Sequence, residues 1–96
     1  MSKPLPSKTD LEELILTCLH AAGGEMNVNE MLLESAKRAN IDIQTRPRIK
    51  QSAKRTDFDY KLAWARTSLK RDNRIERVSF GRWRITSLGQ ELILKK

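Results

Sequence analysis

The segment FDYKLAWARTSLKR, residues 58–71, carries side chains whose chemistry suits contact with a polyanion. At 100° per residue its apolar positions fall within about 60° of one another, which predicts a helix with one buried stripe. That stripe consists of Phe58, Leu62, Ala65 and Leu69. A helix face that contacts only solvent typically carries Glu, Lys and Gln. The opposite arc carries instead Tyr60, Ala63, Trp64, Thr67, Lys70 and Arg71.

Residues that could perform catalysis are scarce. Asp59-Tyr60-Lys61 matches by its letters the Asp/Glu-x-Lys tripeptide of metal-dependent nucleases, but that chemistry needs carboxylates on adjacent strands around one metal. Here the tripeptide lies on the expected helix, and no strand is expected before it. The chain has one His and one Cys, and it lacks a Gly-rich phosphate loop and a Ser/His/Asp set. We therefore expect a binding module with no catalytic residue, no metal site and no cofactor, and with Cys18 as a buried thiol.

Charge is distributed unevenly along the 96 residues, whose formal net charge is +7. Residues 1–43 hold 4 cations and 7 anions, a net charge of −3, whereas residues 44–96 hold 15 cations and 5 anions, a net charge of +10. One acidic and one strongly basic half in a single small domain favour a polyanion as partner. Since no run of about 18 apolar residues and no signal peptide is present, we expect no membrane partner and a cytoplasmic location.

The first half of the chain predicts two helices after a flexible tail at residues 1–8. In the first, Thr9 and Glu12 form a capping-box pair, and Gly23 and Gly24 provide the stop. Its apolar stripe contains Leu11, Leu14, Ile15, Cys18 and Leu19. The second helix is capped by Asn27 with Glu30. Its narrow inner face contains Met31, Leu32, Ser35, Ala36 and Ala39.

A basic connection follows at residues 44–56, where Pro47 disfavours helix at Arg46. It holds five cations without an anion: Arg46, Arg48, Lys50, Lys54 and Arg55. Two interpretations stay open for it, a solvated loop and an arm that contacts phosphate. Asp57 is the expected N-cap of the helix that comes next.

The stretch RIERVSFGRWRIT predicts a β-hairpin with Gly81 and Arg82 at the centre of a type II′ turn. That register pairs Phe80 with Trp83 and Val78 with Ile85 on one half-buried face. It puts Arg77, Ser79, Arg84 and Thr86 on the other face and Arg82 at the tip. A short helix capped by Ser87 with Gln90 would close the chain, packing Leu88, Leu92 and Ile93.

The order helix, helix, basic connection, helix, hairpin, helix predicts an α+β fold: a winged helix-turn-helix with three helices, a β-hairpin wing and a short C-terminal helix, spanning residues 9–96. A generic α+β domain in which the hairpin is only a lid is the alternative. In the winged-helix interpretation the helix at residues 58–71 is the recognition helix.

The run from Phe58 to Ile93 resembles the end of the N-terminal domain of Mrr-type restriction proteins over about 35 residues. The matching positions are Phe58, Lys61, Trp64, Ala65, Arg66, Thr67, Leu69, Gly81, Trp83, Ile85, Thr86 and Gly89. Lys61 stands where the family more often has Arg, and the connection is more basic than the family pattern. The resemblance implies a winged-helix DNA-binding module, usually fused to a nuclease or to a modified-base reader.

Double-stranded DNA is therefore the expected partner, with a homodimer or a fused effector domain as further options. Base edges would be met by Tyr60, Lys61, Ala63 and Thr67, phosphates by Lys70 and Arg71, and the minor groove by Arg82 with Arg77 and Arg84 beside it. The connection would add its five cations. We expect Trp83 to be packed in the core. For Trp64 we favour packing under a neighbouring element, with base stacking or a groove contact as the alternative, and Arg66 either binds phosphate or pairs within the fold. An RNA- or ribosome-binding winged helix and a protein-interaction domain are the alternative functions.

Overall fold

The computed structural model describes residues 5–42 and 56–94 and has an α+β architecture. In chain order its elements are α1 (Lys8–Ala21), β1 (Glu25–Asn27), α2 (Val28–Arg38), α3 (Asp57–Arg71), β2 (Ile75–Ser79), β3 (Arg82–Ile85) and α4 (Ser87–Leu94). The three strands form an antiparallel sheet in the order β1-β3-β2. Four helices and this sheet, within the described residues, are compatible with a winged helix. The basic residues 46–55 of the connection lie outside the described residues.

The predicted helices are present, but three of their four N-caps differ from prediction. Asn27 and Glu30 form the expected capping box, with the Glu30 amide 2.8 Å from Asn27 Oδ1. α1 is capped by Ser7, not by Thr9 with Glu12. α3 is capped by Thr56, not Asp57, and Thr86 Oγ1, not Ser87, accepts the Gly89 amide at the start of α4. In each case an earlier hydroxyl accepts a hydrogen bond from the amide three residues on, so the helix begins sooner than predicted.

The first three helices end in the same way. The residue two places beyond each C-cap donates its amide back into the last turn, as in the bonds Gly24 to Leu19, Ile41 to Ala36 and Arg74 to Leu69. The residue between has positive φ: +90° at Gly23, +58° at Asn40 and +61° at Asn73. Glycine and asparagine tolerate this conformation best, which confirms the predicted stop after α1 and explains why two asparagines end the other helices.

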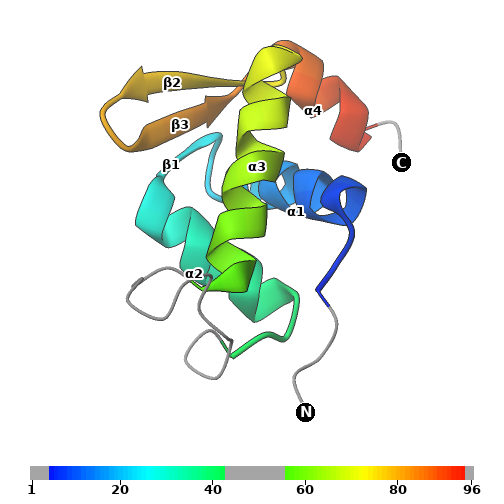
Figure 1. Cartoon of the computed structure of the whole chain (residues 1–96). Helices are drawn as coiled ribbons and strands as arrows, with labels where there is room; N and C mark the ends of the chain where they lie inside the picture. The colour runs from blue at the N-terminus through cyan, green and yellow to red at the C-terminus, as the bar shows by residue number, and fades with distance from the viewer. Residues whose placement is uncertain (1–4, 43–55, 95–96) are drawn as a thin grey trace.

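The core lies where α1 packs against α2, α3 and α4 (Figure 1). The predicted stripe of α3 is fully buried. In α1 the buried set includes Leu16, which was not predicted, whereas Leu14 is only half-buried. α4 lies close enough to bury Leu16 as well, so α1 is covered on two sides and its buried face is wider than one stripe. The inner face of α2 is narrower than predicted, because only Met31, Ser35 and Ala36 are buried and Leu32 and Ala39 are half-buried.

The thiol of Cys18 is buried, as predicted, and contacts Ser35 Oγ at 3.7 Å. Burial raises the pKa of this thiol, and the hydrogen bond to Ser35 acts in the opposite direction.

The hairpin forms where expected, but its predicted register is wrong. Ser79 pairs with Arg82 and Arg77 pairs with Trp83, so the turn consists of Phe80 and Gly81, and Gly81 has φ +72° at the second turn position. A bulge at Val78 then brings Ile75 opposite Ile85. A one-residue slip reverses the face of each side chain on a strand. Phe80 and Val78 are therefore exposed, and Arg77 shares the side of Trp83 instead of the side of Arg84.

The strand β1 was not predicted, and it completes the sheet by pairing with β3. Met26 lies opposite Trp83, and Glu25 lies opposite Arg84. The amide of Val28, the first residue of α2, donates to the carbonyl of Gly81 at 2.8 Å. This strand and this hydrogen bond attach the hairpin to the helical body at its turn as well as at its base.

At the base of the hairpin, α4 packs through a glycine. Gly89 is buried, and a Cβ at this position would lie 2.2 Å from the carbonyl oxygen of Arg74. The same carbonyl accepts the Thr86 amide at 3.0 Å, where the hairpin returns to the end of α3. Leu88 was expected to pack but is 50% exposed, since the glycine and not the leucine faces the contact.

Candidate nucleic-acid interface

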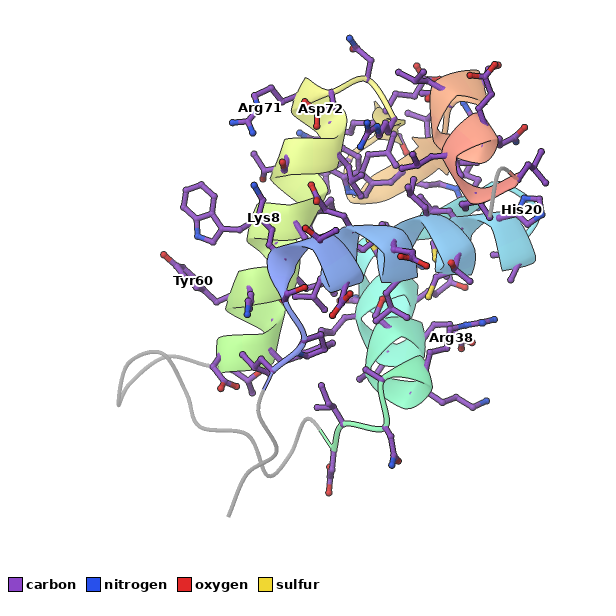
Figure 2. The ribbon with its side chains drawn as sticks, turned by 90° about the vertical axis from the view of Figure 1, so that its right-hand side faces the viewer. Lys8, His20, Arg38, Tyr60, Arg71 and Asp72 are labelled. Carbon is purple, nitrogen blue, oxygen red and sulfur yellow. The ribbon has the colours of Figure 1, made fainter. Side chains whose placement is uncertain are left out.

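The exposed arc of α3 is where most of the predicted recognition residues lie. Tyr60, Thr67, Lys70 and Arg71 are exposed, and Lys61 and Ala63 are half-buried. Figure 2 shows Tyr60 and Arg71 projecting from α3 on the side of the molecule opposite to His20 and Arg38. The helical period thus gives α3 one face for the core and one face for solvent.

Trp64 belongs to this solvent face, so the favoured prediction that it is packed is wrong and the alternative of an exposed side chain holds. Its side chain is 58% exposed and meets Tyr60 edge to face, with ring centroids 6.3 Å apart and an interplanar angle of 77°. α1 packs on the other side of α3 and α4 packs on α1, so neither helix covers this side of α3 (Figure 1). An exposed aromatic pair of this kind offers apolar contact area without occupying the core.

A shallow hollow of about 320 Å³ lies beside these aromatic side chains on α3. It is lined by Tyr60, Ala63, Trp64 and Thr67. Thr67 Oγ1 donates to the Ala63 carbonyl at 2.9 Å, so its hydroxyl hydrogen is used within the helix. The Thr67 oxygen remains an acceptor and its methyl group an apolar contact, which are two properties that suit the edge of a thymine or an adenine.

Two cations on the flank of α3 nearest the hairpin lie over Trp83. The guanidinium of Arg66 is 5.6 Å from the ring centroid and the ammonium of Lys70 is 6.0 Å from it. Trp83 was expected in the core; it is half-buried and packs against the core, while its ring joins α3 to the hairpin. Arg66, left open by the sequence, thus has an aromatic partner within the fold. On the exposed arc, Arg71 donates to Ser68 Oγ at 3.3 Å.

The arginines of the hairpin have partners in the structure that were not expected from the predicted register. Arg82 forms an ion pair with Glu25 of β1, and Arg84 forms one with Glu76 of β2. Arg77 is placed differently: its Nε donates to the Ser79 carbonyl at 3.4 Å, and its guanidinium lies 5.4 Å from the Phe80 ring centroid. The outer face of the sheet therefore carries mixed charge.

The other groups that could carry chemistry lie elsewhere. Asp59 and Lys61 are in the first turns of α3, not on a strand. Among residues 5–42 and 56–94, no three His, Cys, Asp or Glu side chains are grouped as metal ligands, and none of the helices is long and apolar enough to cross a membrane.

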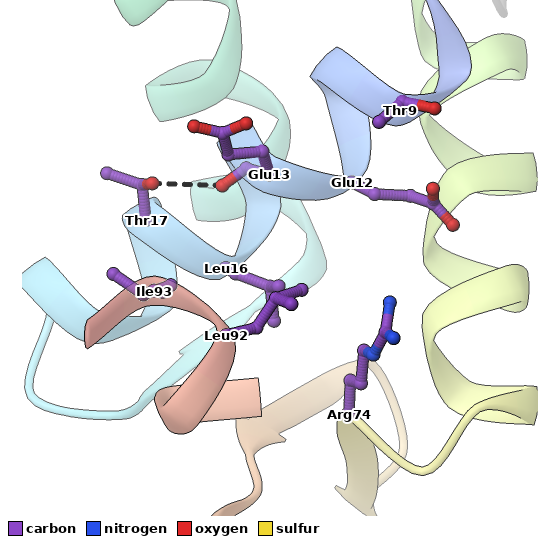
Figure 3. Close-up of a pocket in the computed structure, with 8 residues that line it drawn as sticks. All are labelled: Thr9, Glu12, Glu13, Leu16, Thr17, Arg74, Leu92 and Ile93. Atoms are coloured by element: carbon purple, nitrogen blue, oxygen red, sulfur yellow. Dashed lines mark hydrogen bonds between the residues drawn. The ribbon is translucent and has the colours of Figure 1, made fainter. Parts of the chain in front are cut away.

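A further hollow is a pocket of about 470 Å³ between α1 and α4. Figure 3 shows Leu16 and Leu92 inside it, with Arg74 extending toward the side of α1 that carries Glu12. The lining residues are Thr9, Glu12, Glu13, Leu16, Thr17, Arg74, Leu92 and Ile93. Of the predicted contact residues that lie within residues 56–94, none is among them.

Sequence reasoning overlooked four features of this surface: the exposure of Trp64 and Phe80, and the carboxylates Glu25 and Glu76 beside the hairpin arginines. Trp64 could have been found, because it lies more than 100° from the buried stripe. The others depend on the hairpin register and on β1, for which three residues give little local pattern.

Comparison with known families identifies the chain over nearly its whole length. The family model of the Mrr N-terminal domain matches residues 10–95. Comparisons with curated proteins and with solved structures gave no match. The match extends the resemblance seen in α3 and the hairpin to α1, β1 and α2. The chain therefore belongs to the Mrr N-terminal domain family.

Proposed function

We propose that this chain is a double-stranded DNA-binding module of the winged-helix type that serves as the recognition part of a restriction or defence system. In this proposal α3 enters the major groove and the hairpin β2–β3 is the wing. The chain binds, and any cleavage is performed by an effector domain that is fused or recruited. The observation that carries the proposal is the exposed arc of α3, with its aromatic, small and cationic side chains.

The arrangement of elements supports the winged-helix assignment. A helix, a short strand, two further helices and a hairpin follow one another, and the short strand pairs with the second strand of the hairpin. α3 precedes the hairpin directly, and Trp83 holds the two together under Arg66 and Lys70. A recognition helix and a wing must keep a fixed relative orientation to meet neighbouring grooves, and this contact provides one.

The chemistry of α3 supports contact with base edges. Ala63 and Thr67 are small enough to let the helix approach a groove floor, and the Thr67 methyl can meet a thymine methyl. Lys70 and Arg71 follow one turn later, where they would bind phosphates and set the register of the helix on the duplex. The five cations of the connection would add further phosphate contacts in the same way.

A protein-interaction module is the second candidate, and the exposed Tyr60–Trp64 pair favours it. Aromatic side chains are enriched at protein interfaces, and the hollow beside this pair would accept an apolar side chain. The two candidates differ in their dependence on salt. Phosphate contacts release counterions, so the logarithm of a DNA affinity falls with the logarithm of salt concentration by about 0.9 per contact, whereas an aromatic protein contact lacks such a slope.

The test is binding of the whole chain to labelled duplexes, followed by fluorescence anisotropy between about 50 and 200 mM salt. Thr67→Glu places an anion on the proposed reading face and should abolish binding to specific and to nonspecific duplexes, because it repels the phosphates and rejects base acceptors. Thr67 is exposed, so the variant should keep the parent's circular dichroism and melting temperature.

Two matched controls separate charge from position. Thr67→Gln has a similar size without the charge and should retain nonspecific binding. Gln90→Glu adds the same charge at an exposed position of α4 and should bind like the parent. If folded Thr67→Glu binds duplex DNA as tightly as the parent at low salt, α3 is not the reading helix.

A further inference from the structure

Phe80, at the tip of the hairpin, is 94% exposed, more than any other large apolar side chain of the described residues. It occupies the first position of the two-residue turn between β2 and β3. A phenylalanine that leaves its whole ring in water loses the stabilisation that burial would give, so its position points to a partner that covers it.

The backbone around Phe80 is fixed, so the ring cannot turn back to the core. Gly81 has φ +72°, and its carbonyl accepts the Val28 amide at 2.8 Å. Ser79 pairs with Arg82 on either side of the turn. The turn is thereby attached to the start of α2, and the aromatic ring is presented outward on a rigid support.

A cation accompanies the ring. The Arg77 guanidinium lies 5.4 Å from the ring centroid, and its Nε donates to the Ser79 carbonyl. The neighbouring Arg82 and Arg84 are engaged by Glu25 and Glu76. The tip therefore presents one apolar wedge with one arginine beside it, a combination that fits an unstacked base step next to a phosphate.

We propose that Phe80 enters the minor groove, inserts between two base pairs and bends the duplex, while Arg77 binds the adjacent phosphate. This inference rests on the proposed function, because it requires α3 to hold the duplex first. Apolar side chains that enter base steps in this way kink DNA by about 20–90°. Pyrimidine–purine steps unstack most easily, so insertion is expected at a TA or CA step.

The experiment measures binding and bending separately on one duplex. A duplex of about 25 base pairs with a central TA step carries a donor and an acceptor dye at its ends, and binding is followed by anisotropy in parallel. The parent chain should raise the energy transfer on binding. Phe80→Ala should bind about tenfold more weakly, the size of one aromatic–base stacking contact, and should leave the energy transfer at the value of free DNA.

Two further variants act as controls. Phe80→Leu keeps an apolar wedge and should retain most of the bend. Val78→Ala removes an exposed apolar side chain from the same hairpin, away from the turn, and should bind and bend like the parent. Both positions are exposed, so the melting temperatures of all three variants should be unchanged.

The outcomes distinguish the inference from the function on which it rests. A folded parent chain that fails to bind the duplex overturns the proposed function. If the parent binds and bends DNA and Phe80→Ala does the same, the wedge is refuted while the function stands. The same holds if the parent binds without bending, and the exposed ring would then be assigned to a protein partner.

Discussion

Helix α3 and the hairpin β2–β3 are both rich in arginine and lysine, yet they use these residues differently. In α3 the exposed Lys70 and Arg71 do not pair with a carboxylate among the residues that the structure describes. In the hairpin, Arg82 and Arg84 each meet a glutamate, one of them from the separate strand β1. The two elements carry the same net charge in the sequence. In the structure α3 presents a cationic surface, whereas glutamates offset most of the positive charge of the sheet.

The geometry of the two elements explains the difference. Residues that are directly opposite on neighbouring strands lie about 4.5–5.5 Å apart, which brings Glu76 to Arg84. Long side chains also reach the diagonal position on the neighbouring strand, and Arg82 meets Glu25 in this way. On a helix, side-chain neighbours are three or four positions away. For Lys70 and Arg71 these positions within α3 hold Arg66, Thr67 and Ser68, none of them acidic. A count of cations in the sequence therefore overstates how many are available to bind phosphate.

The largest expected effect tests whether α3 and the hairpin act as one unit. Gly89→Ala would place a Cβ 2.2 Å from the Arg74 carbonyl, which joins the end of α3 to the base of the hairpin. Alanine is more favourable than glycine within a helix by about 1 kcal/mol. The Arg74 carbonyl belongs to the backbone and cannot move aside as a flexible side chain would, so we expect the free energy of unfolding to fall by about 2 kcal/mol or more.

Thermal and urea unfolding would measure this loss, with Gln90→Ala as a control that should stay within about 0.5 kcal/mol of the parent. An unchanged stability of Gly89→Ala would show that α4 can move away without cost. The two regions would then be less firmly joined than the close approach indicates.

The next effect concerns the cations of α3. Lys70→Gln combined with Arg71→Gln should reduce the slope of log affinity against log salt by about 1.8, because two phosphate contacts are lost. Lys37→Gln combined with Arg38→Gln removes the same charge from the last turn of α2 and should change the slope little. Figure 2 shows Arg38 on the side of the molecule away from α3. Equal effects from both pairs would mean that the duplex senses net charge instead of the α3 face.

The smallest effect concerns the balanced sheet and has the opposite sign. Glu25→Gln combined with Glu76→Gln keeps the side-chain size but releases Arg82 and Arg84, so the salt slope should become steeper by about 0.9 for each arginine that then contacts a phosphate, and low-salt affinity should rise. The ion pairs are exposed, so stability should change by about 1 kcal/mol or less. An unchanged slope at unchanged stability would show that these arginines do not approach phosphate even when released.

Much of the helical structure followed from local pattern. The buried stripe of α3, the capping box of Asn27 and Glu30, and the glycine stop of α1 were each predicted from spacing and from residue type. The family match bears out the resemblance that was seen in α3 and the hairpin. These features depend on residues close in sequence, whose contacts the helix itself determines.

The sheet and its charges depended instead on residues far apart in the chain. β1 becomes a strand because β3 offers it an edge, and the hairpin register is set by a bulge and by the bond from Val28 to Gly81. The sequence by itself therefore determined that a cationic, aromatic helix faces solvent. Only the tertiary structure decided that Phe80 is exposed and that Arg82 and Arg84 meet glutamates, because a strand has no register until a partner supplies its hydrogen bonds.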